Sequence, residues 1–361
     1  MKKRTFCTIV GARPQFIKAA LISKELRKKH EEILIHTGQH YDYRMSQIFF
    51  KEFNLLKPDY NLEVGSGQHG YQTGMILQRS EAILLKEKPD QVIVYGDTNS
   101  TLAGALAAAK LGIPVAHVEA GLRSYNRTMP EEINRVLTDR ISAVLLCPTR
   151  TAVDNLKKEG VKSGVHLVGD VMYDIALIYG KIADKKSKIL SKLGVAPKTY
   201  LLLTAHRANN TDNLLNLKNI IEAVAESGER VIFPIHPRTQ KALKQIKFSK
   251  RVHESMKKNL AIIGPVGYID MIKLEMNARK ILTDSGGVQK EAHFFNVPCI
   301  TLREETEWIE TLKDGANILV GTNKKEILKA IVRHQPVSKF KRYFGNGKAY
   351  KKIVSLLSRG K

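Results

Sequence analysis

The sequence predicts an α/β protein built from two doubly wound domains that face each other across a cleft. Its 361 residues fit two domains at roughly 100–200 residues each. Short apolar runs alternate with helical segments in both halves, which is typical of parallel sheets whose strands are joined by helices. We therefore expect an N-terminal domain over residues 1–169 and a C-terminal domain over residues 170–345.

The clearest strand–helix–strand–helix unit lies in the middle of the first half. An apolar run over residues 91–95 precedes an Ala/Leu-rich stretch without proline, residues 98–111, which we predict to be a helix. A second apolar run over residues 114–118 precedes a helix that opens at Pro130, near its first turn. This order and spacing predict a βαβ unit of a parallel sheet.

Three carboxylates follow these elements. Asp97 and Glu119 each come directly after a predicted strand, and Glu131 lies at a helix start that can return to the same edge of the sheet. Ligands of open α/β sheets bind beyond the carboxyl ends of the strands, so the three side chains can converge on one cleft. Asp97 and Glu131 also fit as helix-capping acids. Glu119 fits that alternative poorly, because it lies between an apolar strand and two small residues. We interpret Asp97 and Glu119 as site residues and include Glu131 with them.

The beginning of the chain has the features of an anion-binding turn. A predicted strand over residues 6–10 is followed by Gly11, and then by Arg13 and Lys18 at the start of a helix. Backbone N–H groups and the helix dipole attract anions at such a position. The glycine-rich segment 65–74 is expected to be a loop, either mobile over the cleft or an ordinary surface loop. Further strands of this half are expected at residues 33–36, 143–147 and 165–168.

The second half repeats the pattern. Strands are expected at residues 200–204, 231–234, 260–263, 281–283 and 298–302. The turn Ser285-Gly286-Gly287 opens a helix and could cradle a phosphate, with Glu291 about one turn later placed to accept from a ribose diol. A glycine turn with a helix-stabilising acid explains these residues equally well. His206 and Arg207 form a polar pair at a strand end, which favours a site over a core histidine.

Composition excludes several classes of protein. No apolar run approaches the ~20 residues of a membrane span, and no cysteine pair or zinc-binding pattern occurs. The three cysteines lie in or beside apolar runs and indicate reduced thiols of a cytoplasmic protein. The net charge of +24 fits either nucleic-acid or membrane binding, or a phosphate-bearing ligand together with a lysine-rich surface. We favour the second interpretation because no nucleic-acid motif accompanies the basic residues.

Several motifs in register carry a family resemblance over nearly the whole chain. They are GARPQFIK, GDTNSTLAGALAA, HVEAGLRS, MPEEINR, HPRT, TDSGGVQKEA and FGNGKA. Together they resemble the non-hydrolysing UDP-N-acetylglucosamine 2-epimerases. The resemblance implies the GT-B fold, with two Rossmann-like domains and a last helix, within residues 346–361, that crosses back to the first domain. It also implies a homodimer.

The resemblance also implies residue roles. Asp97, Glu119, Glu131 and His206 match the catalytic group of the family. Arg13 and Lys18 match its basic residues near the diphosphate. The UDP-binding part corresponds to Tyr268 beside the uracil, Ser285, Gly286 and Gly287 at the phosphates, and Glu291 at the ribose. We also expect Arg135, Arg207 and His236 to bind the substrate.

Two positions and one segment depart from the family pattern. Trp308 stands where the family usually has an arginine that contacts the nucleotide, and Lys290 replaces a usual glutamate. The segment 40–45, associated in bacterial members with allosteric binding of a second UDP-GlcNAc, also differs. The Lys290 and Trp308 forms resemble the branch that epimerises UDP-2,3-diacetamido-2,3-dideoxyglucuronate, so two substrates are open.

The chemistry that the resemblance implies is elimination and re-addition of UDP. The C2 proton of an N-acetylhexosamine is not next to a carbonyl group, so direct exchange of that proton is implausible. Loss of UDP makes the C2–H acidic and gives a 2-acetamidoglycal. This route needs cations at the diphosphate and acid–base groups near C1 and C2, but no metal or redox cofactor. A GT-B glycosyltransferase is the alternative within the fold, and a nucleic-acid-binding protein is the alternative of another class.

Overall fold

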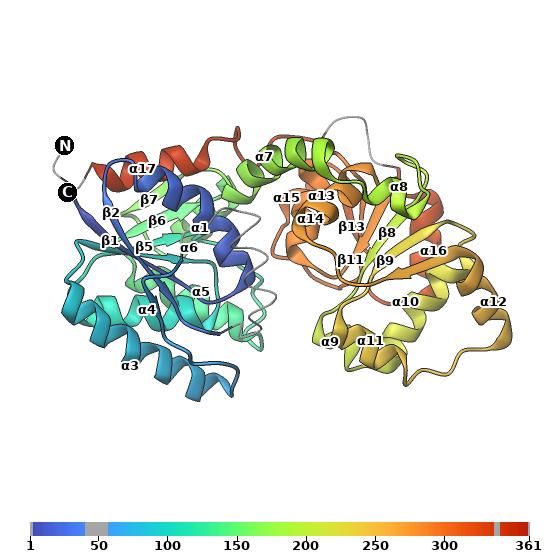
Figure 1. The fold of residues 1–361 in the computed structure, drawn as a ribbon, viewed down its shortest axis with the longest axis horizontal. Helices are drawn as coiled ribbons and strands as arrows, with labels where there is room; N and C mark the ends of the chain where they lie inside the picture. The colour runs from blue at the N-terminus through green and yellow to red at the C-terminus, as the bar shows by residue number, and fades with distance from the viewer. Residues whose placement is uncertain (1–2, 40–56, 336–339, 360–361) are drawn as a thin grey trace. The chain divides into compact units, whose positions relative to one another are not determined.

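The computed structural model describes residues 3–39, 57–335 and 340–359 and divides the chain into two compact units (Figure 1). The first unit contains Met1–Ile175 and Arg342–Lys361, and the second contains Ala176–Lys341. Both boundaries differ by a few residues from the expected ones at 169 and 345. The reason is local: the first turns of helix α7, Val171–Lys186, pack with the returning end of the chain in the first unit.

The first unit is built on a parallel sheet of seven strands in the order β3-β2-β1-β4-β5-β6-β7. The strands are β1 Thr5–Val10, β2 Glu31–His36, β3 Tyr60–Asn61, β4 Gln91–Tyr95, β5 Val115–Val118, β6 Val144–Cys147 and β7 Val165–Leu167. The order runs outward in both directions from the pair β1 and β4, so the sheet changes direction between these two strands. In open α/β sheets the crevice beside such a pair is where ligands bind.

Helices cover both faces of this sheet (Figure 1). They are α1 Arg13–Leu26, α3 His69–Glu87, α4 Asn99–Lys110, α5 Pro130–Ile141, α6 Arg150–Lys158 and α17 Ala349–Ser358. Helices α1 and α17 pack together on one face, and α3, α4 and α5 pack in a row on the other. Alanines of α4, including Ala103 and Ala107, lie in a buried cluster with Ile9 and Val94 of the sheet. Small side chains let this helix approach the strands closely.

The expected loop at residues 65–74 is wrong in its second half, because α3 begins at His69. The buried residues of this helix are Gln72, Ile76, Ser80 and Leu84, one every four residues. That spacing places all four on one face of a helix. Two of the four are polar, so the apolar pattern that predicts a helix is weak here.

The second unit repeats the design with a parallel sheet of six strands in the order β10-β9-β8-β11-β12-β13. The strands are β8 Leu201–Thr204, β9 Val231–Pro234, β10 Leu260–Ile263, β11 Lys280–Thr283, β12 Cys299–Thr301 and β13 Asn317–Leu319. Its helices are α8 Ile189–Leu193, α9 Ala208–Thr211, α10 Leu214–Glu226, α11 Pro237–Leu243, α12 Lys250–Asn259, α13 Tyr268–Asn277, α14 Gly286–Phe294, α15 Glu310–Lys313 and α16 Lys324–Arg333.

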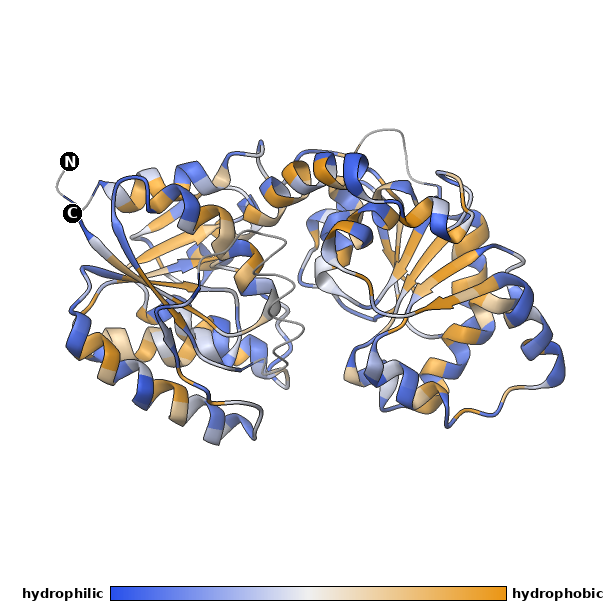
Figure 2. Ribbon diagram, in the orientation of Figure 1, coloured by the Kyte–Doolittle hydropathy of each residue, from blue (hydrophilic) through white to orange (hydrophobic). Residues whose placement is uncertain are grey.

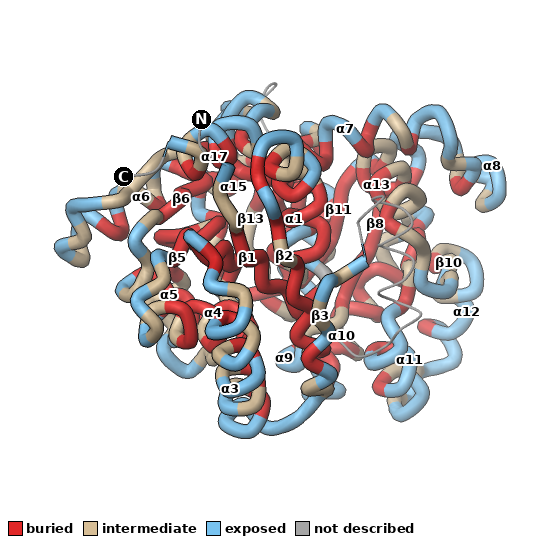
Figure 3. Tube along the Cα trace, turned by 60° about the vertical axis from the view of Figure 1, so that its left-hand side comes forward, coloured by how far each residue is buried: buried red, intermediate tan, exposed pale blue. Residues whose placement is uncertain are grey.

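The core of the second unit has one apolar cluster on each face of the sheet. Leu217 and Ile220 of α10 join Ile327 of α16 against one face. Leu274 of α13 and Ala292 of α14 join the other. The strands of both units are the most apolar part of the fold (Figure 2) and are buried almost throughout (Figure 3). Strands buried on both faces are typical of parallel sheets.

The three cysteines, Cys7, Cys147 and Cys299, are free and buried. Burial raises the pKa of Cys147 and of Cys299 to about 12, so both thiols keep their protons at neutral pH. Among the described residues, no helix is long and apolar enough to cross a membrane.

The chain passes into and out of the second unit at one compact junction of the first. The backbone N–H of Asp170 donates to the carbonyl of Phe344 at 2.9 Å. A Cβ at Gly169 would come within 3.1 Å of that carbonyl oxygen, and Gly169 has a φ of +96° that favours glycine. Asp174, fully buried on α7, accepts from the backbone N–H of Tyr350 at 2.8 Å and so holds the first turn of α17. Burial raises the pKa of this carboxyl group to about 7.

We predict that Asp174 makes the protein less stable as the pH rises from about 4 to about 7. The pKa is about 7 in the folded protein against an ordinary value of 3.8, so in this window the folded state binds more protons than the unfolded state. Asp174→Asn keeps an acceptor for Tyr350 and removes the titration. The melting temperature of the variant should therefore rise relative to the wild type between pH 4 and pH 8. Asp154→Asn, at an exposed position on α6, is the control; a difference independent of pH for Asp174→Asn would contradict the prediction.

Candidate active site

The residues singled out from the sequence lie at the carboxyl ends of the central strands in each unit. In the first unit Gly11 follows β1, Asp97 follows β4 and Glu119 follows β5. Parallel strands bring these ends to one edge of the sheet, on either side of the point where the strand order reverses. The order of the strands is therefore enough to bring Gly11, Asp97 and Glu119 to the same edge of the sheet.

Gln15 joins the turn after β1 to the end of β4. Its side-chain oxygen accepts from the backbone N–H groups of Gly11 at 2.7 Å and Ala12 at 2.9 Å. Its amide nitrogen donates to the carbonyl of Tyr95 at 2.7 Å. A Cβ at Gly11 would lie 2.1 Å from Thr37 Oγ1, so only glycine fits this turn. Gln15 was not predicted as a functional residue, although it stands inside the motif that begins at Gly11.

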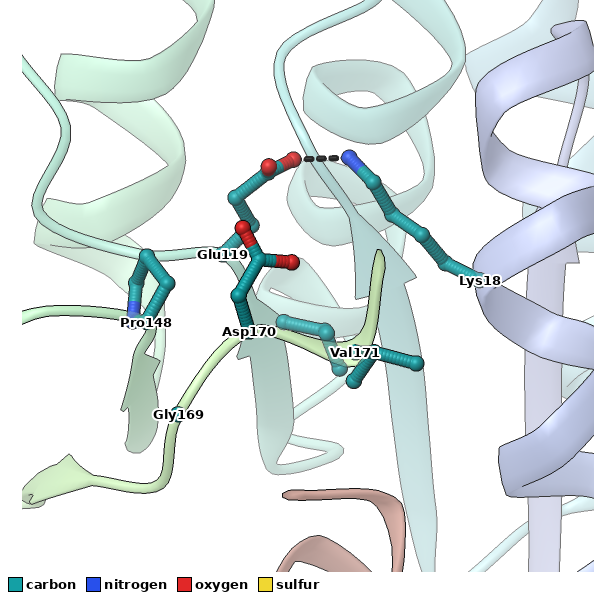
Figure 4. Close-up of a pocket in the computed structure, with 7 residues that line it drawn as sticks. Lys18, Glu119, Pro148, Gly169, Asp170 and Val171 are labelled. Atoms are coloured by element: carbon teal, nitrogen blue, oxygen red, sulfur yellow. Dashed lines mark hydrogen bonds and ion pairs between the residues drawn. The ribbon is translucent and has the colours of Figure 1, made fainter. Parts of the chain in front are cut away.

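Lys18 and Glu119 form a buried ion pair (Figure 4). Their side chains are 9% and 10% exposed. Together with Val118 and Asp170 they line a small pocket of the first unit, where the Asp170 carboxylate also points toward Glu119. Glu119 has a φ of +76°, in the left-handed region that is uncommon for a residue with a side chain. Strained backbone of this kind is often found at functional sites.

Asp97 pairs with Arg135 of α5, and its backbone carbonyl accepts from Asn134 at 3.0 Å. Arg135 is buried and also donates to Glu132 at 2.7 Å. Glu131 is exposed, whereas its neighbour Glu132 is buried and accepts from Ser124 as well. The structure therefore brings Asp97 and Arg135 together, and Glu132, which was not predicted, occupies the interior position of this helix start.

His117 holds the end of β4 in place through both of its ring nitrogens. One ring nitrogen lies 2.7 Å from the carbonyl of Gly96 and the other 2.7 Å from Asp139 Oδ1. Asp139 is buried and also accepts from Arg123 at 2.7 Å. Burial raises the pKa of Asp139, but the hydrogen bond and charge of His117 and the Arg123 guanidinium more than offset it, and the net pKa is lowered. An ionised Asp139 thus fixes the ring that lies between Asp97 and Glu119 in the chain.

His206 and Arg207 follow β8 in the second unit and are half-buried. Their backbone N–H groups donate to the fully buried carboxylate of Asp284, at 2.9 Å and 3.0 Å. His236, exposed at the start of α11, has its ring centroid 5.7 Å from that of His206. Asp284 therefore joins the end of β8 to the turn after β11, a role that no local sequence pattern indicates.

The turn after β11 places Ser285 at the N-cap of α14, with Gly286 buried and Gly287 exposed. The first backbone N–H groups of a helix have no partner within the helix and attract anions. Glu291, buried one turn later, accepts from the hydroxyl of Tyr268 at 2.9 Å. The structure thus brings Tyr268, Glu291 and the glycine turn onto neighbouring elements, α13 and α14.

Lys290 and Trp308, the two single positions that depart from the family pattern, contact each other. The Lys290 ammonium lies 3.8 Å from the centroid of the Trp308 ring, and both residues are buried. This is a cation–π contact, favourable at such a distance when it is shielded from water.

Arg13 begins α1, and the segment 40–45 lies outside the described residues. Within the described part of the chain, no group of three or more His, Cys, Asp or Glu side chains could hold a metal ion.

Two doubly wound units, each with a parallel sheet, place the chain in the class of α/β proteins with two Rossmann-like units. Comparison with known proteins makes this assignment specific. The chain belongs to the UDP-N-acetylglucosamine 2-epimerase family, whose model matches residues 24–358. The family is one of isomerases, so the alternative of a glycosyltransferase is excluded.

Three relatives cover almost the whole chain. A UDP-N-acetylglucosamine 2-epimerase homolog of Methanococcus maripaludis is 59% identical, over 97% of this chain and 98% of its own. A UDP-2,3-diacetamido-2,3-dideoxy-D-glucuronate 2-epimerase of Pseudomonas aeruginosa is 46% identical, over 98% and 99%. The crystal structure of Methanocaldococcus jannaschii UDP-GlcNAc 2-epimerase in complex with UDP-GlcNAc and UDP matches with a TM-score of 0.89 and 49% identity, over 99% and 100%. The predicted α/β fold class is confirmed.

We predict that Lys18→Met destabilises the protein more than loss of a surface charge would. The substitution removes the ammonium group that pairs with the buried Glu119 carboxylate, and breaking a buried pair costs about 3–5 kcal/mol. Urea unfolding should show this loss, and the double variant Lys18→Met/Glu119→Gln should recover much of it. Lys24→Met, at an exposed position of the same helix, is the control. Equal destabilisation in the single and double variants would show that the pair is not the cause.

Proposed function

We propose that this protein is a non-hydrolysing UDP-N-acetylglucosamine 2-epimerase that interconverts UDP-GlcNAc and UDP-ManNAc. The observation that carries the proposal is the buried Lys18–Glu119 pair at a strained strand end, in a chain of this family. The crystallised relative from M. jannaschii, named for this activity, binds UDP-GlcNAc and UDP. That likeness supports the same substrate here.

The proposed reaction removes and returns UDP. The C1–O bond breaks and its electron pair leaves with the β-phosphate oxygen of UDP. The C2 proton passes to an enzyme base, and the C–H electron pair forms the C1=C2 double bond of a 2-acetamidoglycal. UDP then adds back to C1 while C2 receives a proton on its other face. Atoms and electrons balance without an oxidant or a metal.

The proposed residues of each unit are taken separately. In the first unit, Asp97, Glu119 and Glu131 are the carboxylate candidates for acid–base work and for stabilising positive charge at C1. In the second unit, His206 is the candidate catalytic residue. Among these, Glu119 has the best support, because it is buried with a cation that can stabilise its charged form. Arg13, Lys18, Arg135, Arg207 and His236 are proposed to bind the substrate.

The nucleotide is proposed to bind to the second unit. Ser285, Gly286 and Gly287 would hold phosphate through backbone N–H groups at the start of α14, and the Glu291 carboxylate would accept from the ribose hydroxyls. Tyr268 would lie beside the uracil. The hydrogen bond from Tyr268 to Glu291 supports this arrangement, because it links the two residues assigned to adjacent parts of one nucleoside.

The second candidate substrate is UDP-2,3-diacetamido-2,3-dideoxyglucuronate, used in the synthesis of surface polysaccharides. The cation–π pair of Lys290 and Trp308 favours it, since these residues distinguish the chain from the usual family pattern. The P. aeruginosa relative is named for this activity.

A cytoplasmic location is supported by the three free, buried cysteines, and a homodimer by the family resemblance.

We predict that epimerisation in D2O labels C2 of the sugar and no other carbon. Removal of the C2 proton and its replacement from an exchanging enzyme acid require this outcome. Proton NMR of parallel reactions with UDP-GlcNAc and the diacetamido-uronate identifies the substrate at the same time. With ¹⁸O in the bridging position, label should also scramble into the non-bridging oxygens, because the C1–O bond breaks. Product formed with hydrogen retained at C2 would falsify elimination and re-addition.

We predict that Glu119→Gln lowers kcat about 10²–10⁴-fold, the usual contribution of a general acid–base group. The amide keeps the size of the side chain, so the affinity for UDP should stay near that of the wild type. Coupled turnover assays and calorimetry measure the two effects. Glu254→Gln, at an exposed position on α12, is the matched control. A decrease in kcat under about 3-fold would remove Glu119 from the catalytic group.

A further inference from the structure

The carboxylate of Glu307 lies directly on the turn that opens α14. A Cβ placed at Gly286 would come within 2.3 Å of Glu307 Oε1 and 3.2 Å of Trp308 Nε1. Any side chain at position 286 would therefore collide with this carboxylate. Glu307 belongs to the segment between β12 and α15, so it reaches the turn from a neighbouring strand connection.

Two arginines of the same unit face this carboxylate. Arg303 Nη1 donates to Glu307 Oε2 at 3.1 Å, and Arg207 Nη2 lies 3.8 Å from Oε1. The Arg303 side chain is only 8% exposed, and its buried Nη2 has no hydrogen-bond partner among the residues that the structure describes. A buried guanidinium with an unused donor, beside a helix start, is suited to a further anion.

The backbone on either side of Glu307 is anchored to α14. Thr306 Oγ1 donates to Gln289 Oε1 at 2.6 Å and accepts from the backbone N–H of Trp308 at 3.1 Å. The Trp308 ring packs on Lys290 of the same helix. The segment that carries Glu307 is therefore held against α14, so an exchange of anions at the turn requires movement of the Glu307 side chain and not of this backbone.

We infer that Glu307 is an internal anion that competes with the diphosphate of the nucleotide for the start of α14 and for Arg207 and Arg303. This inference rests on the proposed function, which places phosphate at Ser285–Gly287. A carboxylate and a phosphate seek the same donors: backbone N–H groups at the positive end of a helix and the forked N–H groups of arginine. When the diphosphate binds, the two arginines exchange Glu307 for phosphate oxygens, and Arg303 Nη2 gains an acceptor.

The charge of Glu307 lowers the affinity for anionic ligands. A resident negative charge weakens the binding of an anion at the same place and leaves a neutral ligand unaffected. It also keeps both arginines paired whenever phosphate departs, so that UDP does not leave a buried cation uncompensated. Glu307 therefore lowers nucleotide affinity in proportion to the charge on the ligand.

The test is calorimetric titration of Glu307→Gln with UDP, inorganic pyrophosphate and uridine. The amide keeps the shape and loses the charge. A charge near a helix terminus is worth about 0.3–2 kcal/mol, so the dissociation constant for UDP should fall about 2- to 30-fold. Pyrophosphate should show a gain in the same direction, and uridine should show none. Glu304→Gln, an exposed glutamate of the same segment, is the matched control and should change nothing.

Two further variants, Glu307→Ala and Arg303→Gln, test the same competition for UDP. Glu307→Ala should give the same gain, and it replaces Glu307→Gln if the amide variant melts at a lower temperature. Arg303→Gln should weaken UDP at least 10-fold and leave uridine unchanged. Weaker or unchanged UDP binding by both Glu307 variants overturns the inference, as does an equal gain for uridine. Failure of the wild type to bind UDP would instead overturn the proposed function itself.

Discussion

The buried ion pair between Lys18 and Glu119 is the interaction on which the first unit's site depends. Two charges removed from water are costly unless each is paired and held in good geometry. The fold supplies that geometry from several directions. Gln15 fixes the turn that leads to Lys18, and the ring of His117 fixes the end of β4 beside β5. The strained backbone of Glu119 is stable only because these surroundings determine it.

The second unit solves a similar electrostatic problem with neighbouring charges of both signs. Asp284 is fully buried and holds the turn after β8 through backbone N–H groups. Glu307 lies on the turn after β11 with two arginines around it. Both carboxylates stand at the edge of the sheet where the proposed site has its anionic ligand. Negative charge built into a phosphate-binding region balances the cations that such a region requires.

Much of the fold could be predicted because parallel strands are short, apolar and buried on both faces. The strands at residues 91–95, 231–234 and 260–263 agree with the observed ones. Helix α3 could not be recognised, since half of its buried positions are polar. At the start of α5, adjacent glutamates point about 100° apart on a helix, and composition does not tell which one faces inward. The contacts of Asp139 with His117 and of Glu307 with Gly286 join distant segments, so no local pattern indicates them.

The junction at Gly169 and Phe344 has a consequence for the order in which the protein is made. The first unit is interrupted in the chain, and its helix α17 is synthesised after the whole second unit. Until α17 is made, α1 lacks the helix that packs against it. The hydrogen bond from Arg4 to the carbonyl of Leu357 in α17, at 2.7 Å, is also missing. At about 5–20 residues per second, translation of the second unit takes on the order of ten seconds or more. During that time α1 stays uncovered on the side where α17 later packs, while the inserted unit, continuous in sequence, can fold first.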